Sequence, residues 1–444
     1  MPPDQSRQTQ RHALECRDIV TLMHQQDTGS NPDETLHIAR ATFGDVFAVG
    51  EFRVLWLSQL LSVIGDQLAR VALTLLVYDR THSALLAAVT FAASVVPIFL
   101  GGLTLAGVAD RLPRRRVMIM CDVLRCAGVF AMAVSGMPLA ALVALLFAVT
   151  MISTLFSSAR AAVYPEILSG DRLVLGNAVT LTTNQLAQVV GFAAGGLIVG
   201  FVGVRTSLLA DAATFAASAL LIRIWVHARP ASGPPQEGSP SRLADLLMGA
   251  RLVFTQPALR TPMLLGWLAA FYNAPEGIAA PLSRSVHSGT AAVGPILAAA
   301  ALGASAGAVA FSRLVRPSAR LSWMRPLAVA SCAVLILFAL KPPLPLTLAI
   351  LFCSGVFDCF QVAASAAFIT TAPHAHRSQA FGLAQAGMSL GQGTAMILAG
   401  AAAEHFAPAE VVAVAGALGA VTAVVIAVTG ASRHKRAPLG HAPG

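Results

Sequence analysis

The sequence predicts an all-α integral membrane protein with twelve transmembrane helices, arranged as two pseudo-symmetric halves of six helices each. The first observation is composition: 56% of the 444 residues are hydrophobic and only 11% are charged, whereas soluble domains average about a quarter charged residues. Lipid solvates such an apolar surface, and water does not. The second observation is that apolar runs of the length needed to cross a bilayer recur along the chain. The third is that the two halves share landmarks.

The first half, residues 51–226, contains six apolar runs separated by short polar connections. They lie at roughly 53–78, 84–108, 116–135, 138–160, 177–202 and 205–226. A cytoplasmic linker, 227–260, follows and is rich in Pro, Gly and Ser. Its second half, from Ser241 to Thr255, has helical spacing and is expected to lie along the membrane surface.

The second half, residues 261–430, repeats the pattern. Its runs lie at roughly 261–283, 290–312, 322–340, 344–370, 379–404 and 409–430. The polar residues 1–50 lack the apolar middle of a signal peptide, so we expect a disordered cytoplasmic extension there, and residues 431–444 form a cytoplasmic tail.

Arginine placement predicts the orientation. Alternate connections are crowded with arginine, as at Arg114–Arg116 and Arg313–Arg320, whereas the connections between them hold only Arg80, Arg205, Arg284 and Lys341. By the positive-inside rule the crowded connections are cytoplasmic. Both termini are then cytoplasmic, and the protein is a multi-pass protein of the inner (plasma) membrane.

Several function classes are excluded by what the sequence lacks. The arginines form no continuous basic face, so no nucleic-acid partner is expected. The two lysines, Lys341 and Lys435, are followed by Pro342 and Arg436, so there is no Walker A motif. No HExxH or CxxC pattern appears, and we expect no metal, no cofactor and no enzymatic activity. A membrane enzyme or structural membrane protein is the rival of a different class, and it lacks a nucleophile pair or a phosphate loop. The expected partners are the lipid bilayer, a small-molecule substrate and protons, with the chain as a monomer.

The halves share internal landmarks. Asp66 lies in the middle of the first run and Glu276 in the middle of the seventh, and a basic loop follows both the second and the eighth run. Pro165 and Pro373 occupy corresponding positions. Internal symmetry of this kind is typical of secondary transporters built from two repeats.

Polar residues occur at helical spacing inside the first run, where Gln59, Ser62, Asp66 and Arg70 share one face. Charged side chains inside a membrane are costly and usually face a cavity or a partner. Asp66 and Arg70 are four residues apart, so they can form a structural ion pair. Alternatively, Asp66 is a carboxyl group that exchanges a proton, with Arg70 tuning it.

The seventh and tenth runs carry further candidates. Tyr272 and Glu276 share a face, and Pro275 should break the helix between them and free backbone carbonyls toward a cavity. Trp267 and Phe271 add aromatic surface for an amphipathic ligand; the alternative is a core aromatic cluster with one satisfied acid. In the tenth run Asp358 and Gln361 lie on one face. The proton-coupling candidates are Asp66, Glu276 and Asp358, and the substrate-binding candidates are Gln59, Arg70, Trp267, Phe271, Tyr272 and Gln361.

Two motifs remain. The fifth run contains "GFAAGGLIVG", in which Gly191, Gly195 and Gly196 are small residues that let helices approach closely. The loop "GVADRLPRRR" anchors the topology and resembles the motif G-x-x-x-D-R-x-G-R-R of the major facilitator superfamily. Asp110, Arg111, Arg114 and Arg115 match, whereas Ala106 and Pro113 stand where that motif has glycine.

The resemblance implies a major facilitator fold and a role for the basic loop as a conformational switch, in which Asp110 caps a helix beginning near Ser378. "GFAAGG" resembles the end of the antiporter motif G-P-x-x-G-G, with Phe192 in place of proline. The chain further resembles the twelve-span drug/proton antiporter branch related to macrolide and enterobactin exporters.

That branch implies a secondary active exporter that couples antiport of protons to a small amphipathic drug or secondary metabolite by alternating access, a route to multidrug resistance. The alternative is an importer or facilitator of a small polar nutrient on the same fold, which would favour more polar groups and a less aromatic seventh run.

Overall fold

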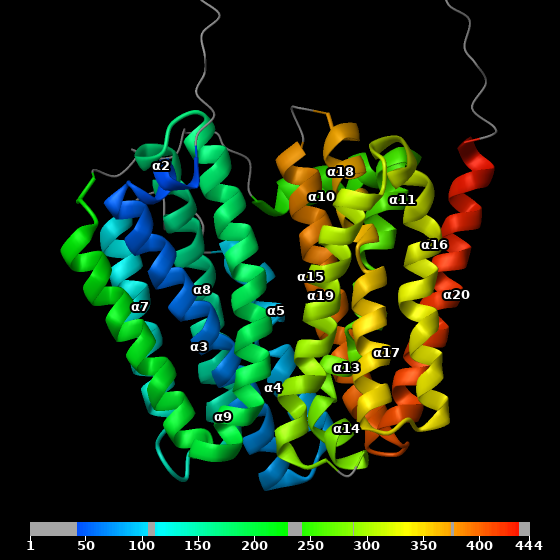
Figure 1. The fold of residues 1–444 in the computed structure, drawn as a ribbon, viewed down its shortest axis with the longest axis horizontal. Helices are drawn as coiled ribbons and strands as arrows, with labels where there is room; N and C mark the ends of the chain where they lie inside the picture. The colour runs from blue at the N-terminus through cyan, green and yellow to red at the C-terminus, as the bar shows by residue number, and fades with distance from the viewer. Residues whose placement is uncertain (1–41, 105–111, 230–241, 287, 374–376, 435–444) are drawn as a thin grey trace, which may run out of the picture. The chain divides into compact units, whose positions relative to one another are not determined.

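The computed structural model describes residues 42–104, 112–229, 242–286, 288–373 and 377–434, and those from Phe43 onward belong to one unit. Every predicted apolar run is helical there (Figure 1). The helices of the first half are α3 (Gly50–Thr81), α4 (Ala84–Ala92), α5 (Val96–Thr104), α7 (Arg114–Met132), α8 (Leu139–Ile167) and α9 (Asp171–Trp225).

The fifth and sixth runs form α9, whose 55 residues are too long for one crossing. A bilayer core about 30 Å thick needs about 20 helical residues. The helical backbone is interrupted at Gly203, with φ 81° and ψ 164°, which is a conformation that only glycine adopts readily. The break falls between the two predicted runs and returns the chain across the membrane (Figure 1).

The second half is more broken. After α10 (Arg242–Thr255), the seventh run, which contains Pro262, Pro275 and Pro281, is divided into short helices. The helices of this half are α11 (Pro257–Gly266), α12 (Ala269–Tyr272), α13 (Ala274–Gly277), α14 (Ala279–Ser285), α15 (Val293–Leu314), α16 (Arg320–Ala333), α17 (Leu344–Phe357), α18 (Phe360–Thr371), α19 (Arg377–Ala403) and α20 (Pro408–His434). Short 3₁₀ segments precede α15 and α16 and follow α16.

Eight helical segments of the described part are long and apolar enough to cross a membrane. α7 is not among them because it carries Arg114–Arg116, Asp122 and Arg125. The predicted all-helical membrane fold is confirmed.

The predicted disordered N-terminal extension ends later in the sequence than the structure allows. Disorder is expected as far as residue 50, but Phe43–Phe47 form helix α2. Val46 is fully buried against Phe52 of α3, so apolar packing holds this segment on the first half. Residues 1–41 lie outside the described residues.

The two halves pack against each other through α4 and α19, α5 and α19, and α9 and α15. Two polar contacts join them where α3 passes into α4 and α19 into α20, which we call the closed end. Arg284 forms an ion pair with Asp79. Glu404, just after α19, accepts hydrogen bonds from Ser83 Oγ at 2.6 Å and from the Leu85 backbone N–H at 2.8 Å.

Candidate functional site

Three of the predicted site residues meet in the second half. The Tyr272 hydroxyl, at the end of α12, donates a hydrogen bond of 2.6 Å to Asp358 Oδ1. The Gln361 amide donates to the Tyr272 hydroxyl at 2.9 Å and to the Gly266 carbonyl at 3.0 Å. That carbonyl is available because α11 ends at Gly266, within the segment that the prolines divide. The result is a connected polar network between α11, α12, the C-terminal end of α17 and α18.

The aromatic candidates separate. The Trp267 indole donates to the Ala384 carbonyl at 3.0 Å and lines a cavity of 40 Å³ together with Gln361. Phe271 points elsewhere, because its Cβ packs where a side chain on Gly419 of α20 would stand. The structure therefore brings Trp267 and Tyr272 toward Gln361 and does not bring Phe271 to them.

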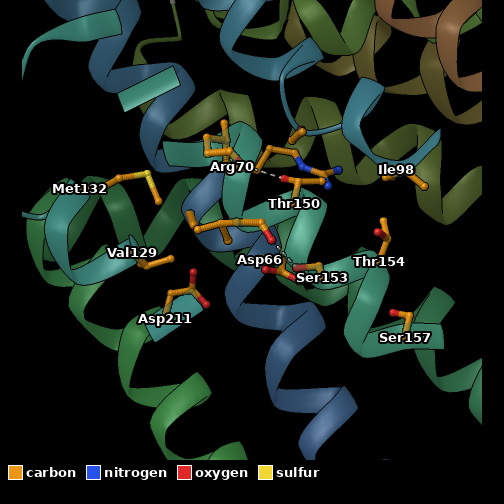
Figure 2. A pocket seen from close by; sticks show the side chains of 14 residues that line it. Asp66, Arg70, Ile98, Val129, Met132, Thr150, Ser153, Thr154, Ser157 and Asp211 are labelled. Carbon is orange, nitrogen blue, oxygen red and sulfur yellow. Dashed lines mark hydrogen bonds between the residues drawn. The ribbon is translucent and has the colours of Figure 1, made fainter. Parts of the chain in front are cut away.

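In the first half, Asp66 and Arg70 line a cavity of 310 Å³ (Figure 2). The helical spacing allows an ion pair between them, but in the described part of the chain they form none. Instead the Arg70 guanidinium lies over the Phe91 ring, with Cζ 5.6 Å from the centroid. It faces two carboxylates electrostatically, Asp66 on its own helix and Glu276 on α13 of the other half.

Gln59, the remaining candidate, has its amide occupied. It donates a hydrogen bond of 3.2 Å to Asn184 Oδ1, and one turn earlier the Trp56 indole donates to Thr183 Oγ1 at 3.0 Å. Both bonds join α3 to α9. A substrate would have to compete with Asn184 for the Gln59 amide.

Sequence reasoning missed a buried ion pair in the third run. Asp122 and Arg125 of α7 are both buried and form an ion pair. Asp122 Oδ2 accepts a hydrogen bond of 2.6 Å from Ser218. The Arg125 Cζ lies 4.4 Å from the centroids of both the Phe156 and the Phe215 rings.

Sequence reasoning also missed Asp211, which is 1% exposed in the second part of α9 and lines the same cavity as Asp66. These residues could have been predicted by the same rule that singled out Asp66 and Arg70 in the first run. A charged residue inside an apolar run is costly unless it faces a cavity or a partner.

The structure describes only part of the basic loop, from Leu112 onward. Asp110, Arg111 and the predicted cap near Ser378 lie outside the described side chains. Arg114 donates to the Ala162 carbonyl at 2.7 Å and forms an ion pair with Glu166, both on α8. Arg115 donates to the Arg223 carbonyl at the end of α9. These contacts of the two arginines stay within the first half.

The three candidate glycines of the fifth run, Gly191, Gly195 and Gly196, lie at helix crossings. Side chains on Gly191 or Gly195 would meet Gln67 or Val71 of α3. A side chain on Gly196 would overlap the backbone of Gly294 on α15, so this crossing joins the two halves through direct backbone contact.

Two helical halves that pack around intramembrane charged groups define a membrane transporter architecture. The sequence profile of the Major Facilitator Superfamily matches residues 55–370 and again 277–443. The chain therefore belongs to the major facilitator superfamily. It is a multi-pass secondary transporter of small molecules and not an enzyme.

Curated relatives include exporters. The multidrug efflux pump Tap of Mycolicibacterium fortuitum is 27% identical over 362 residues, covering 77% of this chain and 87% of that protein. The enterobactin exporter EntS of Shigella boydii serotype 4 (strain Sb227) is 26% identical over 269 residues, covering 59% of this chain and 63% of that protein. The match thus spans less than two thirds of that exporter's length.

Solved structures share the fold. A POT family transporter in complex with 5-aminolevulinic acid has a TM-score of 0.70 at 12% identity, covering 88% of this chain and 98% of that one. A mutant form of the nucleoside transporter NupG has a TM-score of 0.62 at 16% identity, covering 85% and 99%. At these identities the likeness concerns the fold alone.

Proposed function

We propose that this chain is a proton-coupled antiporter that exports a small amphipathic drug or secondary metabolite by alternating access. The observation that carries the proposal is that Arg70 lines the same cavity as Asp66 and interacts electrostatically with Asp66 in its own half and with Glu276 in the other. Charged groups inside a membrane mark ion pathways and proton relays. An arginine that two carboxylates share links the protonation of either one to the packing of the two halves.

The direction of transport is supported by the relatives. Tap is named as a multidrug efflux pump and EntS as an enterobactin exporter. We place both termini in the cytoplasm, so that the closed end, where Glu404 and Arg284 join the halves, faces the outside as in an inward-facing state. An exporter takes up its substrate from this state.

The substrate class is supported by the side chains around the cavity between α11, α18 and α19. Trp267 and Gln361 line this cavity, and Tyr272 and Asp358 continue the polar network from Gln361. Ligand sites in proteins typically combine an apolar lining with a few polar groups that fix orientation. An amphipathic molecule matches this combination better than a sugar does.

The test is accumulation of ethidium and a panel of other amphipathic compounds in cells stripped of their own exporters. The cells carry wild type, Asp66→Asn, Glu410→Gln or an empty vector, with and without a protonophore. Glu410 is the matched control, because its carboxylate pairs with Lys341 at 2.9 Å in an exposed ion pair at the closed end. We expect wild type and Glu410→Gln to lower accumulation, and a protonophore to abolish the effect.

Asp66→Asn should be present in the membrane at wild-type level and accumulate compounds as the empty vector does. Full uphill export by Asp66→Asn would remove that residue from the coupling mechanism. Export by wild type that is unaffected by a protonophore would refute proton coupling.

A further inference from the structure

The cavity beside Asp66 has a second carboxyl group that the proposed function does not use. Asp211 lies on the part of α9 after Gly203 and is 1% exposed. Its Oδ2 has no hydrogen-bond partner among the described residues, and its Oδ1 receives only a long hydrogen bond of 3.4 Å from Thr214. Burying a carboxylate with so few partners is strongly unfavourable. The carboxyl group lines the cavity together with Asp66 (Figure 2).

Gly65 brings the two acids together. A Cβ at Gly65 would overlap Asp211 Oδ1, so the bare backbone of α3 lets the Asp211 carboxyl lie directly against the residue that precedes Asp66. The Asp66 charge acts on Asp211 electrostatically. Two ionised carboxylates repel each other strongly when they lie this near to one another in a region of low dielectric constant. Such a pair therefore binds one proton.

The positive charges around the two acids are too few to neutralise every carboxylate, and one negative charge remains unbalanced. In the first half, three charged groups interact electrostatically with the two acids. They are the Asp122 carboxylate and the guanidinium groups of Arg125 and Arg70. Asp122 neutralises Arg125 through their ion pair, and Arg70 balances one more acid. The Cys126 thiol of α7 also faces Asp211, and Glu276 faces Arg70 from the other half. An unpaired charge is costly to bury, so the surplus acid is expected to bind a proton.

The cavity gives this pair a way to exchange its proton. Its volume is 310 Å³, and a water molecule takes about 30 Å³ of liquid volume. Along α8 it is lined by the hydroxyls of Thr150, Ser153, Thr154 and Ser157. Val129, Leu146 and Val149 form an apolar lining that lowers the local dielectric.

We propose that Asp66 and Asp211 form one proton-binding site, in which the two carboxyl groups share a single proton that exchanges through the cavity. The site rests on the proposed proton-coupled function and locates its proton within the first half. The link to transport is Arg70. When the pair loses its proton, its negative charge attracts Arg70 more strongly and competes with the electrostatic attraction between Arg70 and Glu276 of the other half. Asp211 is therefore a coupling residue.

The test is infrared difference spectroscopy of the full-length protein in lipid nanodiscs, which follows the carbonyl band of protonated carboxyl groups as pH is varied. The variants are Asp66→Asn, Asp211→Asn and the double variant, with Asp358→Asn as the control from the other half. We expect each single variant to lose the same band and the double variant to lose nothing more. Asp358→Asn should retain that band. Asp211→Glu keeps a carboxyl group and should restore a shifted band, which separates loss of the site from loss of the fold.

The proposal is overturned if Asp211→Asn retains the complete wild-type band and exports ethidium against its gradient as wild type does. It is also overturned if Asp66→Asn and Asp211→Asn remove two different bands, since the groups then titrate independently. Failure of the proposed function gives a different result, namely wild-type cells whose export ignores a protonophore. That outcome removes the transport role of the pair as well.

Discussion

Glu404 should stabilise the closed end by capping a helix that belongs to the other half. Its carboxylate accepts from the Leu85 backbone N–H in the first turn of α4 and from the hydroxyl of Ser83, the N-cap residue. The first N–H groups of a helix have no partner within it, and a negative charge near them also complements the helix dipole. We therefore expect Glu404→Ala to destabilise the conformation seen here.

The magnitude follows from the exposure of the contact. A side-chain cap contributes about 0.5–2 kcal/mol, and solvent screening of an exposed carboxylate places this contact in the lower part of that range. A loss of about 0.5–1 kcal/mol changes the ratio of the two conformations by roughly 2- to 5-fold. The matched control is Glu410→Ala, which removes an exposed acid at the same end whose partner, Lys341, lies in its own half.

The assay is double electron–electron resonance on the full-length protein in nanodiscs, with one spin label at the exposed Ser135 and one at the exposed Leu340. These residues belong to different halves at the closed end, so opening of that end lengthens the distance between labels. A population shift in Glu404→Ala no larger than in Glu410→Ala would refute the capping argument.

The same contact predicts a pH dependence. Hydrogen bonds from the Leu85 N–H and the Ser83 hydroxyl hold the pKa of Glu404 below its ordinary value of 4.5. A lowered pKa means that the stabilisation is complete above the ordinary pKa and is lost as pH falls through the lowered one. Near neutral pH the contribution of Glu404 to the conformational ratio should therefore be complete and independent of pH, and wild type should approach Glu404→Ala in strong acid.

Three further predictions concern packing and buried polar groups, each measured as a thermal-unfolding shift of the purified protein. Gly307→Leu should destabilise by about 1–3 kcal/mol, because even a Cβ there would overlap the Val356 carbonyl; Gly200→Leu, which has nothing within 4 Å, is the control and should be near neutral. Tyr272→Phe should cost about 1–3 kcal/mol by leaving its carboxylate partner without that donor, and an unchanged melting temperature would contradict the network. Arg125→Met should cost about 3–5 kcal/mol by stranding a buried carboxylate, and also neutralising that carboxylate should recover part of the loss.

The sequence predicted the helices well because membrane insertion depends on local composition. A run of about 20 apolar residues must be helical in lipid, where no water satisfies the backbone. The break within α9 fell at the predicted boundary because Gly203 adopts a positive φ. The breaks after Tyr272 and Gly277 followed from Pro275 and Pro281, because proline removes a helix hydrogen bond and clashes with the carbonyl four residues before it. Where packing decided the outcome instead, the prediction was wrong, as for Phe43–Phe47, which apolar contacts hold on the first half.

The candidate site divides in the same way. Helical periodicity placed Tyr272, Asp358 and Gln361 on polar faces, and the tertiary structure joined those faces into one network. Periodicity also allowed an ion pair between Asp66 and Arg70, whereas tertiary packing places the Arg70 guanidinium over the Phe91 ring.

By itself, the sequence determined that this protein crosses a membrane as two sets of helices and which runs carry polar stripes. Only the tertiary structure decided which stripes meet, because contacts between runs far apart in the chain depend on how helices approach each other. The bare backbone at Gly65 is what lets Asp211 reach the residue beside Asp66, and no local pattern encodes that approach. Glu404 and Ser83 likewise meet across 321 positions of sequence separation. Composition and periodicity act within one helix, whereas the placement of charge in the interior is a property of the packed bundle.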